Sequence, residues 1–293
     1  MRVLMSGASG LLGSAIRRSL KADGAEVTGL VRGNGTGPDQ IPWEPGRPLT
    51  LNSSFDAVIH LAGESVVGRW TAAKKARIRD SRVVGTRTLS EAVARMEVKP
   101  RVMIAASAIG FYGDRGEAVL TENSNSGTGF LAEVSREWEA ASEPAERAGV
   151  RVAHIRTGIV LSQHGGALKQ MLLPFRFGLG GRLGDGKQWM SWIHIDDHVG
   201  AVRFVLHNES VRGPVNFTAP NPVTNAEFTT ALGKALSRPA ILPAPAFALR
   251  LAFGQMADEA LLASARVLPE RLLSNGYSFR FHELGPALED LLA

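Results

Sequence analysis

Short apolar runs alternate with longer amphipathic stretches along most of the chain. The runs predict buried strands near residues 2–4, 26–32, 56–61, 101–107, 150–157 and 215–220. Apolar residues at helical spacing between them predict helices, among them a long one over residues 71–96. Because strands that alternate with helices are typical of parallel sheets covered on both faces, the pattern predicts an α/β fold, a doubly wound parallel sheet.

The last part of the chain has a different pattern. A proline-rich segment, residues 239–245, follows the sixth strand and its helix and leads into short helical stretches. With 293 residues, 44% of them hydrophobic, the chain can form one large unit with a subordinate lobe. We expect a nucleotide-binding domain over 1–235, with 165–190 on the substrate side, and a small, mainly helical C-terminal substrate lobe over 236–293.

Composition narrows the class of protein. The chain has no cysteine, which excludes disulfides, thiolate metal sites and cysteine nucleophiles and favours a cytoplasmic setting. No apolar run reaches the ~18 residues of a membrane span. The net charge of +5 is spread along the chain, and its densest basic run, 74–82, contains no interleaved aromatic residue. We therefore expect a small-molecule substrate, no nucleic acid, no membrane and no metal, in a monomer or homodimer.

A glycine-rich turn follows the first predicted strand. Gly7, Gly10 and Gly13 are three residues apart and open a helix, with Ser9, Leu11 and Leu12 between them. Such a turn exposes backbone N–H groups at a helix N-terminus, where the helix dipole favours a pyrophosphate. This stretch is the predicted cofactor-binding turn.

The end of the second predicted strand indicates which dinucleotide binds. An NAD-selective site carries a carboxylate there, which accepts hydrogen bonds from the ribose 2′-OH. Here Val31 and Arg32 are followed by Gly33-Asn34-Gly35, and the first acid is Asp39. Because a guanidinium pairs with the 2′-phosphate, Arg32 favours NADP(H).

Two other strand ends are predicted to contact the cofactor. Leu61, Ala62 and Gly63 close the third strand, and small residues at a carboxyl end let a dinucleotide lie against the backbone. Val160, after the fifth strand, is predicted to lie near the nicotinamide ribose.

Taken together, the motifs carry a family resemblance. They are GASGLLG at 7–13, HLAGE at 60–64, SRVVGTR at 81–87, LLPFR at 172–176 and WIHIDD at 192–197. The set resembles an atypical extended short-chain dehydrogenase/reductase, of the NAD(P)-dependent epimerase-like family with a characteristic C-terminal domain, a nucleoside-diphosphate-sugar epimerase subgroup. The resemblance implies a Rossmann fold over essentially the whole chain.

The resemblance also implies roles for two further residues, Arg82 and Ser107, and Tyr112 lies nearby in sequence as a group that could replace the usual acid–base pair. Arg82 lies in the segment that passes beneath the nicotinamide half of the cofactor in such proteins. Ser107 matches the serine or threonine that hydrogen-bonds the reacting carbonyl or hydroxyl, and Tyr112 is the tyrosine nearest to it in sequence. Ser107 and Tyr112 are the predicted catalytic residues.

The sequence departs from the superfamily at its acid–base pair, a tyrosine followed four residues later by lysine. The aligned positions hold Phe130 and Val134, and neither Tyr112 nor Tyr277 has a lysine four residues later. We therefore expect an NADP(H)-binding oxidoreductase or epimerase-like enzyme without the usual pair, acting on a substrate that is sugar-like or nucleotide-linked. The alternative is a non-catalytic NADPH-binding sensor or interaction protein.

Overall fold

A parallel sheet forms the centre of the protein in this computed structural model, which describes residues 1–33, 35 and 37–293. Its strand order is β11-β7-β5-β4-β1-β2-β3, with every neighbouring pair parallel. The strands are β1 (Arg2–Ser6), β2 (Glu26–Val31), β3 (Gln40–Pro42), β4 (Ala57–His60), β5 (Val102–Ala108), β7 (Arg151–Thr157) and β11 (Gly213–Phe217).

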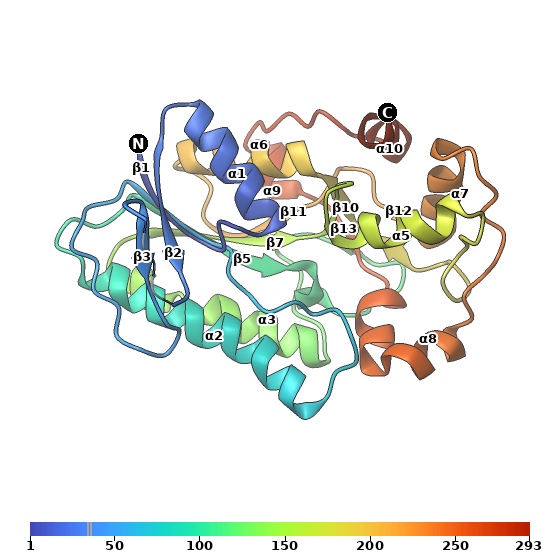
Figure 1. Cartoon of the computed structure of the whole chain (residues 1–293), viewed down its shortest axis with the longest axis horizontal. Helices are drawn as coiled ribbons and strands as arrows, with labels where there is room; N and C mark the ends of the chain where they lie inside the picture. Colours follow the sequence, from blue (N-terminus) through green and yellow to red (C-terminus); the bar gives the residue numbers. More distant parts are fainter. Residues whose placement is uncertain (34, 36) are drawn as a thin grey trace.

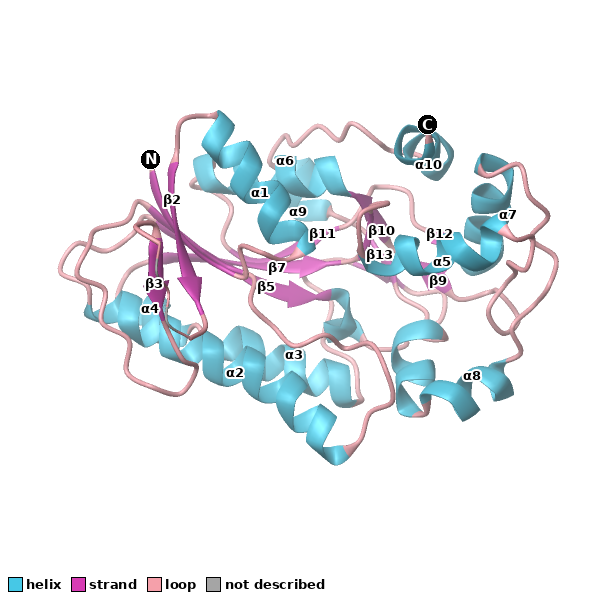
Figure 2. Ribbon diagram, viewed as in Figure 1, coloured by secondary structure: helices cyan, strands magenta, loops and turns pink. Residues whose placement is uncertain are grey.

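Helices cover both faces of this sheet, as Figures 1 and 2 show. On one face lie α1 (Leu11–Ala22) and α6 (Ile195–His207), and on the other lie α2 (Ala72–Arg95), α3 (Phe130–Ala140) and α4 (Glu143–Arg147). Strand β1 shows why both layers form: Val3 and Met5 are buried in one core cluster with α1 and α6, whereas Leu4 is buried in the other with α2 and α4. The predicted doubly wound fold is confirmed.

The order of the strands reverses at β1, because the chain passes from β1 to β2 on one side and then to β4 on the other. In open parallel sheets a ligand binds at such a switch point, outside the carboxyl ends of the strands. The glycine turn after β1 and the small residues after β4 both lie there.

Most of the remaining elements gather beyond the carboxyl edge of the sheet (Figure 1). They include α5 (Gly166–Arg176), α7 (Asn225–Ala235), α8 (Ala246–Phe253), α10 (Leu284–Leu292) and the single turns η1 (Ile109–Tyr112) and η2 (Ala257–Leu261). Helix α9 (Glu270–Ser274) instead packs against β11, on the face of the sheet that carries α1 and α6. Short strands pair as β6 (Val119–Leu120) with β13 (Arg266–Val267), β8 (Ile159–Leu161) with β10 (Trp192–His194), and β9 (Trp189–Met190) with β12 (Val223–Thr224).

The C-terminal segment is tied closely to the rest of the molecule. The pairing of β13 with β6 joins residues almost 150 positions apart, and α10 packs on α7 in a shared apolar core. The Tyr277 hydroxyl donates to the Asp197 carbonyl at 2.8 Å, and Phe279 belongs to the sheet core. None of the helices in the described ranges is both long and apolar enough to cross a membrane.

Helix α6 begins earlier than its sequence suggests. Asp196 and Asp197 resemble capping residues for a helix that starts at His198, but the helix starts at Ile195 and His194 is the cap. The His194 Nδ1 atom accepts a hydrogen bond from the Asp196 backbone N–H at 3.1 Å. Asp197 instead accepts from the backbone N–H groups of Arg280 and Phe281, which fixes the C-terminal segment onto α6.

Candidate functional site

The glycine turn brings three pieces of backbone into close contact. Gly7 has φ of +70°, and a Cβ there would lie 2.8 Å from the backbone N of Ala62, at the end of β4. A Cβ at Gly13 would lie 2.0 Å from the Gly7 carbonyl oxygen. Both positions therefore require glycine, because any side chain would separate α1 from the sheet.

The N-terminus of α1 is open to an anion. Its N-cap is Gly10, which has no side chain to accept from the free N–H groups, and the first turn contains no acidic residue. Ser9 and Gly10 are exposed, and Leu11 and Leu12 are partly buried beneath them. The first-turn amides and the helix dipole together fit a pyrophosphate.

Arg32 lies at the carboxyl end of β2, directly after Val31, and its side chain is exposed. Within residues 1–33, 35 and 37–293, Arg32 forms no ion pair. Asn34, two positions later in the sequence, lies outside the described residues. Asp39 is bound by α1, with Arg17 at 2.9 Å and Lys21 at 3.5 Å. The nearest acid is thus neutralised, and Arg32 is available to a phosphate.

Beside the glycine turn, the end of β4 supports the cofactor cleft. The Ser6 hydroxyl lies 2.6 Å from the His60 Nδ1 atom, and the Ala62 N–H points to the same hydroxyl at 3.4 Å. Leu61 and Ala62 are partly buried and Gly63 is exposed. On the far side, Val160 is partly buried in β8, and a Cβ at Gly165 would lie 3.3 Å from Leu11, so α5 begins directly above α1.

Arg82 lies next to Gly63, but protein groups already hold its guanidinium. Its Nη1 atom donates to the Glu64 carbonyl at 2.9 Å and to the Ile78 carbonyl at 3.1 Å, and it stacks on Trp138. Burial lowers the pKa of Arg82 to about 10. These contacts shape the loop after β4, and a direct contact of Arg82 with cofactor stays a prediction.

The predicted catalytic hydroxyls both belong to a buried polar network. The Ser107 hydroxyl donates to the Glu139 carboxylate at 2.6 Å, and the same carboxylate receives two hydrogen bonds of 2.8 Å from Arg156. Arg156 Nη1 donates to the Tyr112 hydroxyl at 3.0 Å. Sequence reasoning identified Ser107 and Tyr112 but missed the Glu139–Arg156 pair that links them, since α3 and β7 supply these residues from separate parts of the chain.

Tyr112 is the more enclosed of the two. Its side chain is fully buried, and its hydroxyl donates to the Asn216 side-chain oxygen at 2.7 Å. Burial raises the pKa of Tyr112. Because the hydroxyl has both a donor and an acceptor inside the protein, a substrate would have to displace one of them to reach it.

The positions of the missing acid–base pair lie at the start of α3. Phe130 packs in an apolar cluster with Trp70, Met256 and Phe253, and Val134 is buried. The Glu259 carboxylate caps the helix, accepting from the N–H groups of Phe130 at 3.1 Å and Leu131 at 2.8 Å. Sequence reasoning missed this cap, although Gly129 and the acidic run at 258–259 were visible signals of it.

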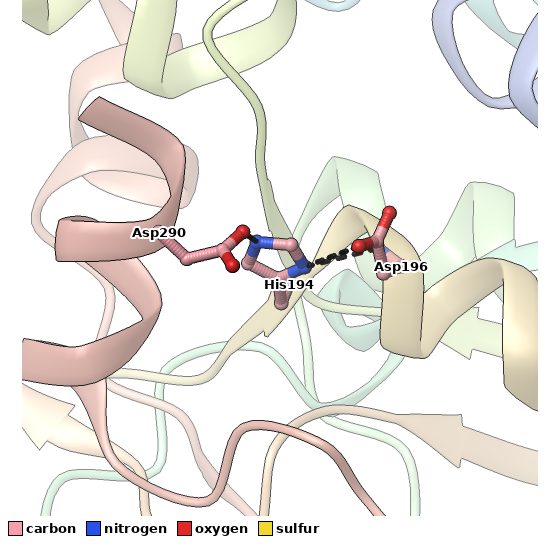
Figure 3. Close-up of side chains that lie close together, drawn as sticks. All are labelled: His194, Asp196 and Asp290. Carbon is pink, nitrogen blue, oxygen red and sulfur yellow. Dashed lines mark hydrogen bonds and ion pairs between the residues drawn. The ribbon is translucent and has the colours of Figure 1, made fainter. Parts of the chain in front are cut away.

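A histidine and two aspartates approach one another where α10 meets α6 (Figure 3). The Asp290 carboxylate lies 3.4 Å from His194 Nε2, whereas Asp196 lies 4.0 Å from the opposite ring nitrogen. Arg280 pairs with both carboxylates at 2.9 Å. Since the carboxylates face different ring nitrogens and Arg280 already pairs with both of them, the cluster joins two helices and is poorly suited to a cation.

The burial of two histidines predicts that the folded protein loses stability at acidic pH. Burial lowers the pKa of His60 to about 4 and that of His198 to about 3, against about 6.5 in an unfolded chain. Below pH 6.5 the unfolded state therefore binds more protons than the folded state. The free energy of unfolding is highest above pH 6.5 and decreases towards pH 4 by up to about 1.4 kcal/mol per pH unit for each histidine. Urea denaturation at pH 7 and 5.5 checks this: His198→Gln should reduce the difference, whereas the exposed His207→Gln should leave it unchanged.

The fold and the glycine turn together define a dinucleotide-binding protein of the doubly wound α/β class. Residues 3–217 match the NAD dependent epimerase/dehydratase family, and residues 244–291 match a domain family of unknown function. The chain belongs to the NAD dependent epimerase/dehydratase family, which confirms the family predicted from its motifs.

The relatives match at least 98% of this chain. An epimerase family protein of Mycobacterium bovis is 44% identical over 98% of this chain and 96% of its own length. The crystal structure of human epimerase family protein SDR39U1 with NADPH superposes with a TM-score of 0.93 at 35% identity, covering 100% of this chain and 99% of the human one. The crystal structure of a nucleoside-diphosphate sugar epimerase from Corynebacterium glutamicum is 39% identical with a TM-score of 0.83, and the match covers 100% of this chain and 58% of that one.

Proposed function

We propose that this protein is an NADP(H)-dependent oxidoreductase that reduces a carbonyl group of a small-molecule substrate. The observation that carries the proposal is the exposed Arg32 at the end of β2, in a site whose nearest acid, Asp39, is bound by α1. The human relative crystallised with NADPH supports the same cofactor.

The residues around the switch point fit this cofactor. The first-turn N–H groups of α1, after Gly10, would hold the pyrophosphate, and Arg32 would pair with the 2′-phosphate. Leu61, Ala62 and Gly63 would line one side of the cleft. The bound cofactor supplies the hydride for the reaction.

The protein's own contribution to proton transfer is restricted. Phe130 and Val134 cannot exchange a proton, so the tyrosine–lysine mechanism of the superfamily is not open to this chain. The Ser107 hydroxyl donates its hydrogen bond to the Glu139 carboxylate. Its oxygen lone pairs are left to accept a hydrogen bond from a water or a substrate hydroxyl. A role for Ser107 or Tyr112 in polarising the carbonyl stays a prediction.

The same geometry favours a second candidate, a non-catalytic NADPH-binding sensor. Both hydroxyls that the sequence offered for catalysis have protein partners, and Glu259 and an apolar cluster surround the place of the missing tyrosine. Epimerisation is less well supported than either, because it needs a proton removed and returned as well as a hydride.

A carbonyl panel separates the two candidates. We expect NADPH consumption with at least one aldehyde or ketone, and a decrease in kcat of about 100-fold in Ser107→Ala if its hydroxyl assists proton transfer. The exposed Ser53→Ala is the matched control and should be unaffected. NADPH binding without turnover on any compound would favour the sensor, and turnover that survives Ser107→Ala would remove Ser107 from the mechanism.

A further inference from the structure

The most exposed apolar side chains of the protein gather on one part of the surface. Of the seven large apolar side chains with the highest exposure in the described residues, six lie on α5, on α8 and on the segments that follow α5 and precede α8. Their exposed fractions run from 61% to 78%, and α8 has no buried side chain. We call this surface the apolar face; its members are Leu173, Phe177, Leu179, Ile241, Phe247 and Leu251.

Hydrogen bonds hold the two segments of the apolar face side by side. The Leu242 N–H donates to the Gly180 carbonyl at 3.1 Å, and the Gly184 N–H donates to the Ala244 carbonyl at 2.9 Å. Arg238 adds a bond of 3.1 Å from its side chain to the Arg176 carbonyl. These bonds join the segment after α5 to the segment before α8, about 60 positions later in the sequence, so the two parts of the apolar face are built against each other.

The apolar face adjoins the carboxyl edge of the sheet. Helix α5 starts above Leu11 of the glycine turn, and the other end of the face reaches the loop after β4, where Arg69 donates to the Leu251 carbonyl at 2.9 Å. Figure 1 shows α5 and α8 on this side of the sheet. A molecule lying on the face would thus extend to the cleft in which we place the cofactor.

The net charge around the face is positive. No acidic residue occurs in 166–184 or in 228–257, the two stretches that build it. Lys169, Arg176 and Arg182 are exposed, and none has an ion-pair partner within the described part of the chain. Asp258, just beyond the second stretch, already pairs with Arg250 of α8 at 2.8 Å. Within the two stretches the charged side chains without an ion-pair partner are therefore cations, and the complementary molecule is an anion.

We propose that the apolar face binds the substrate, and that the substrate is an anionic amphiphile: a carbonyl compound with a long apolar portion and a carboxylate or phosphate group. The apolar portion would cover Phe177, Phe247 and Leu251, and the anionic group would pair with Lys169 or Arg176. This inference rests on the proposed function, because the cofactor cleft supplies the hydride to the carbonyl.

Calorimetry with dodecanoate as the probe, below its micellar concentration and with NADPH present, tests the proposal. Wild-type protein should bind dodecanoate, and the double variant Phe247→Ser/Leu251→Ser should bind it at least about 10-fold more weakly, because the variant lacks two apolar side chains that the alkyl chain would cover. Val98→Ser is the control, because Val98 is 64% exposed and lies outside the face. All three substitutions are at exposed positions, so the variants should fold.

Charge reversal of the probe completes the test. Dodecyltrimethylammonium should bind much more weakly than dodecanoate, and Lys169→Gln/Arg176→Gln should remove the difference. Equal binding of the two probes, binding of anionic vesicles with no binding of monomeric dodecanoate, or a dimer that the serine variant dissociates would each overturn the proposal. NADPH affinity measured on the same samples separates the proposed function from the proposed substrate site. A wild-type protein that does not bind NADPH would refute the cofactor site, whereas dodecanoate binding reports on the apolar face alone.

Discussion

Replacing Glu139 by alanine should lower the free energy of unfolding by about 3–5 kcal/mol. Arg156 is 4% exposed at its side chain, and Glu139 is the only acid that pairs with it in the described residues. Without that carboxylate, Arg156 remains charged and buried beside Phe111 and Tyr112, and Ser107 loses its acceptor. Chemical denaturation followed by circular dichroism measures the change.

The same helix provides the control. Glu137 also pairs with an arginine, Arg79, but both side chains are more than a third exposed, so Glu137→Ala should cost less than about 1 kcal/mol. Equal losses in the two variants would show that the buried network does not stabilise the sheet edge as described.

Replacing Gly13 by alanine should abolish NADPH binding. The added Cβ would lie 2.0 Å from the Gly7 carbonyl oxygen, so α1 must move away from the turn and its first N–H groups must leave the position that fits a pyrophosphate. Gly285→Ala is the control, because a Cβ at that helical glycine meets nothing within 4 Å.

A milder variant covers the case in which Gly13→Ala fails to fold. At Gly10 a Cβ would contact only the Gly7 oxygen, at 3.4 Å, and would otherwise point into the open side of the turn. Gly10→Ala should therefore fold normally and still weaken NADPH binding. Unchanged affinity in a folded Gly10→Ala protein would mean that the cofactor does not approach the backbone here.

Local sequence signals were sufficient for six of the seven strands of the sheet; the short edge strand β3, Gln40–Pro42, has no such signal. Five of its strands coincide with short apolar runs, because parallel strands buried on both faces must be apolar throughout. The edge strand β11 begins two residues before the predicted start, at Gly213 and Pro214. The glycine turn was equally visible, since the close approach of Gly7 and Gly13 to other backbone requires glycine at those positions. The family followed from the same motifs.

Side-chain environments were harder to foresee. Nothing near Ser107 or Tyr112 in sequence indicates that Glu139, Arg156 and Asn216 would engage their hydroxyls, because those partners come from three other elements. The capping roles of His194 and Glu259 were missed for the same reason: a cap depends on where the chain returns, and α3 is capped from 129 positions away.

The central claim is that this chain holds NADP(H) through the glycine turn and Arg32. Calorimetric titration of the wild-type protein with NADPH and with NADH tests it most directly, repeated on Arg32→Ala. We expect NADPH to bind at least about 10-fold more tightly than NADH, as one charge-assisted pair to a phosphate implies, and Arg32→Ala to remove that preference while leaving NADH affinity unchanged. Equal affinity for the two dinucleotides in the wild-type protein, unaltered by Arg32→Ala, would contradict the account.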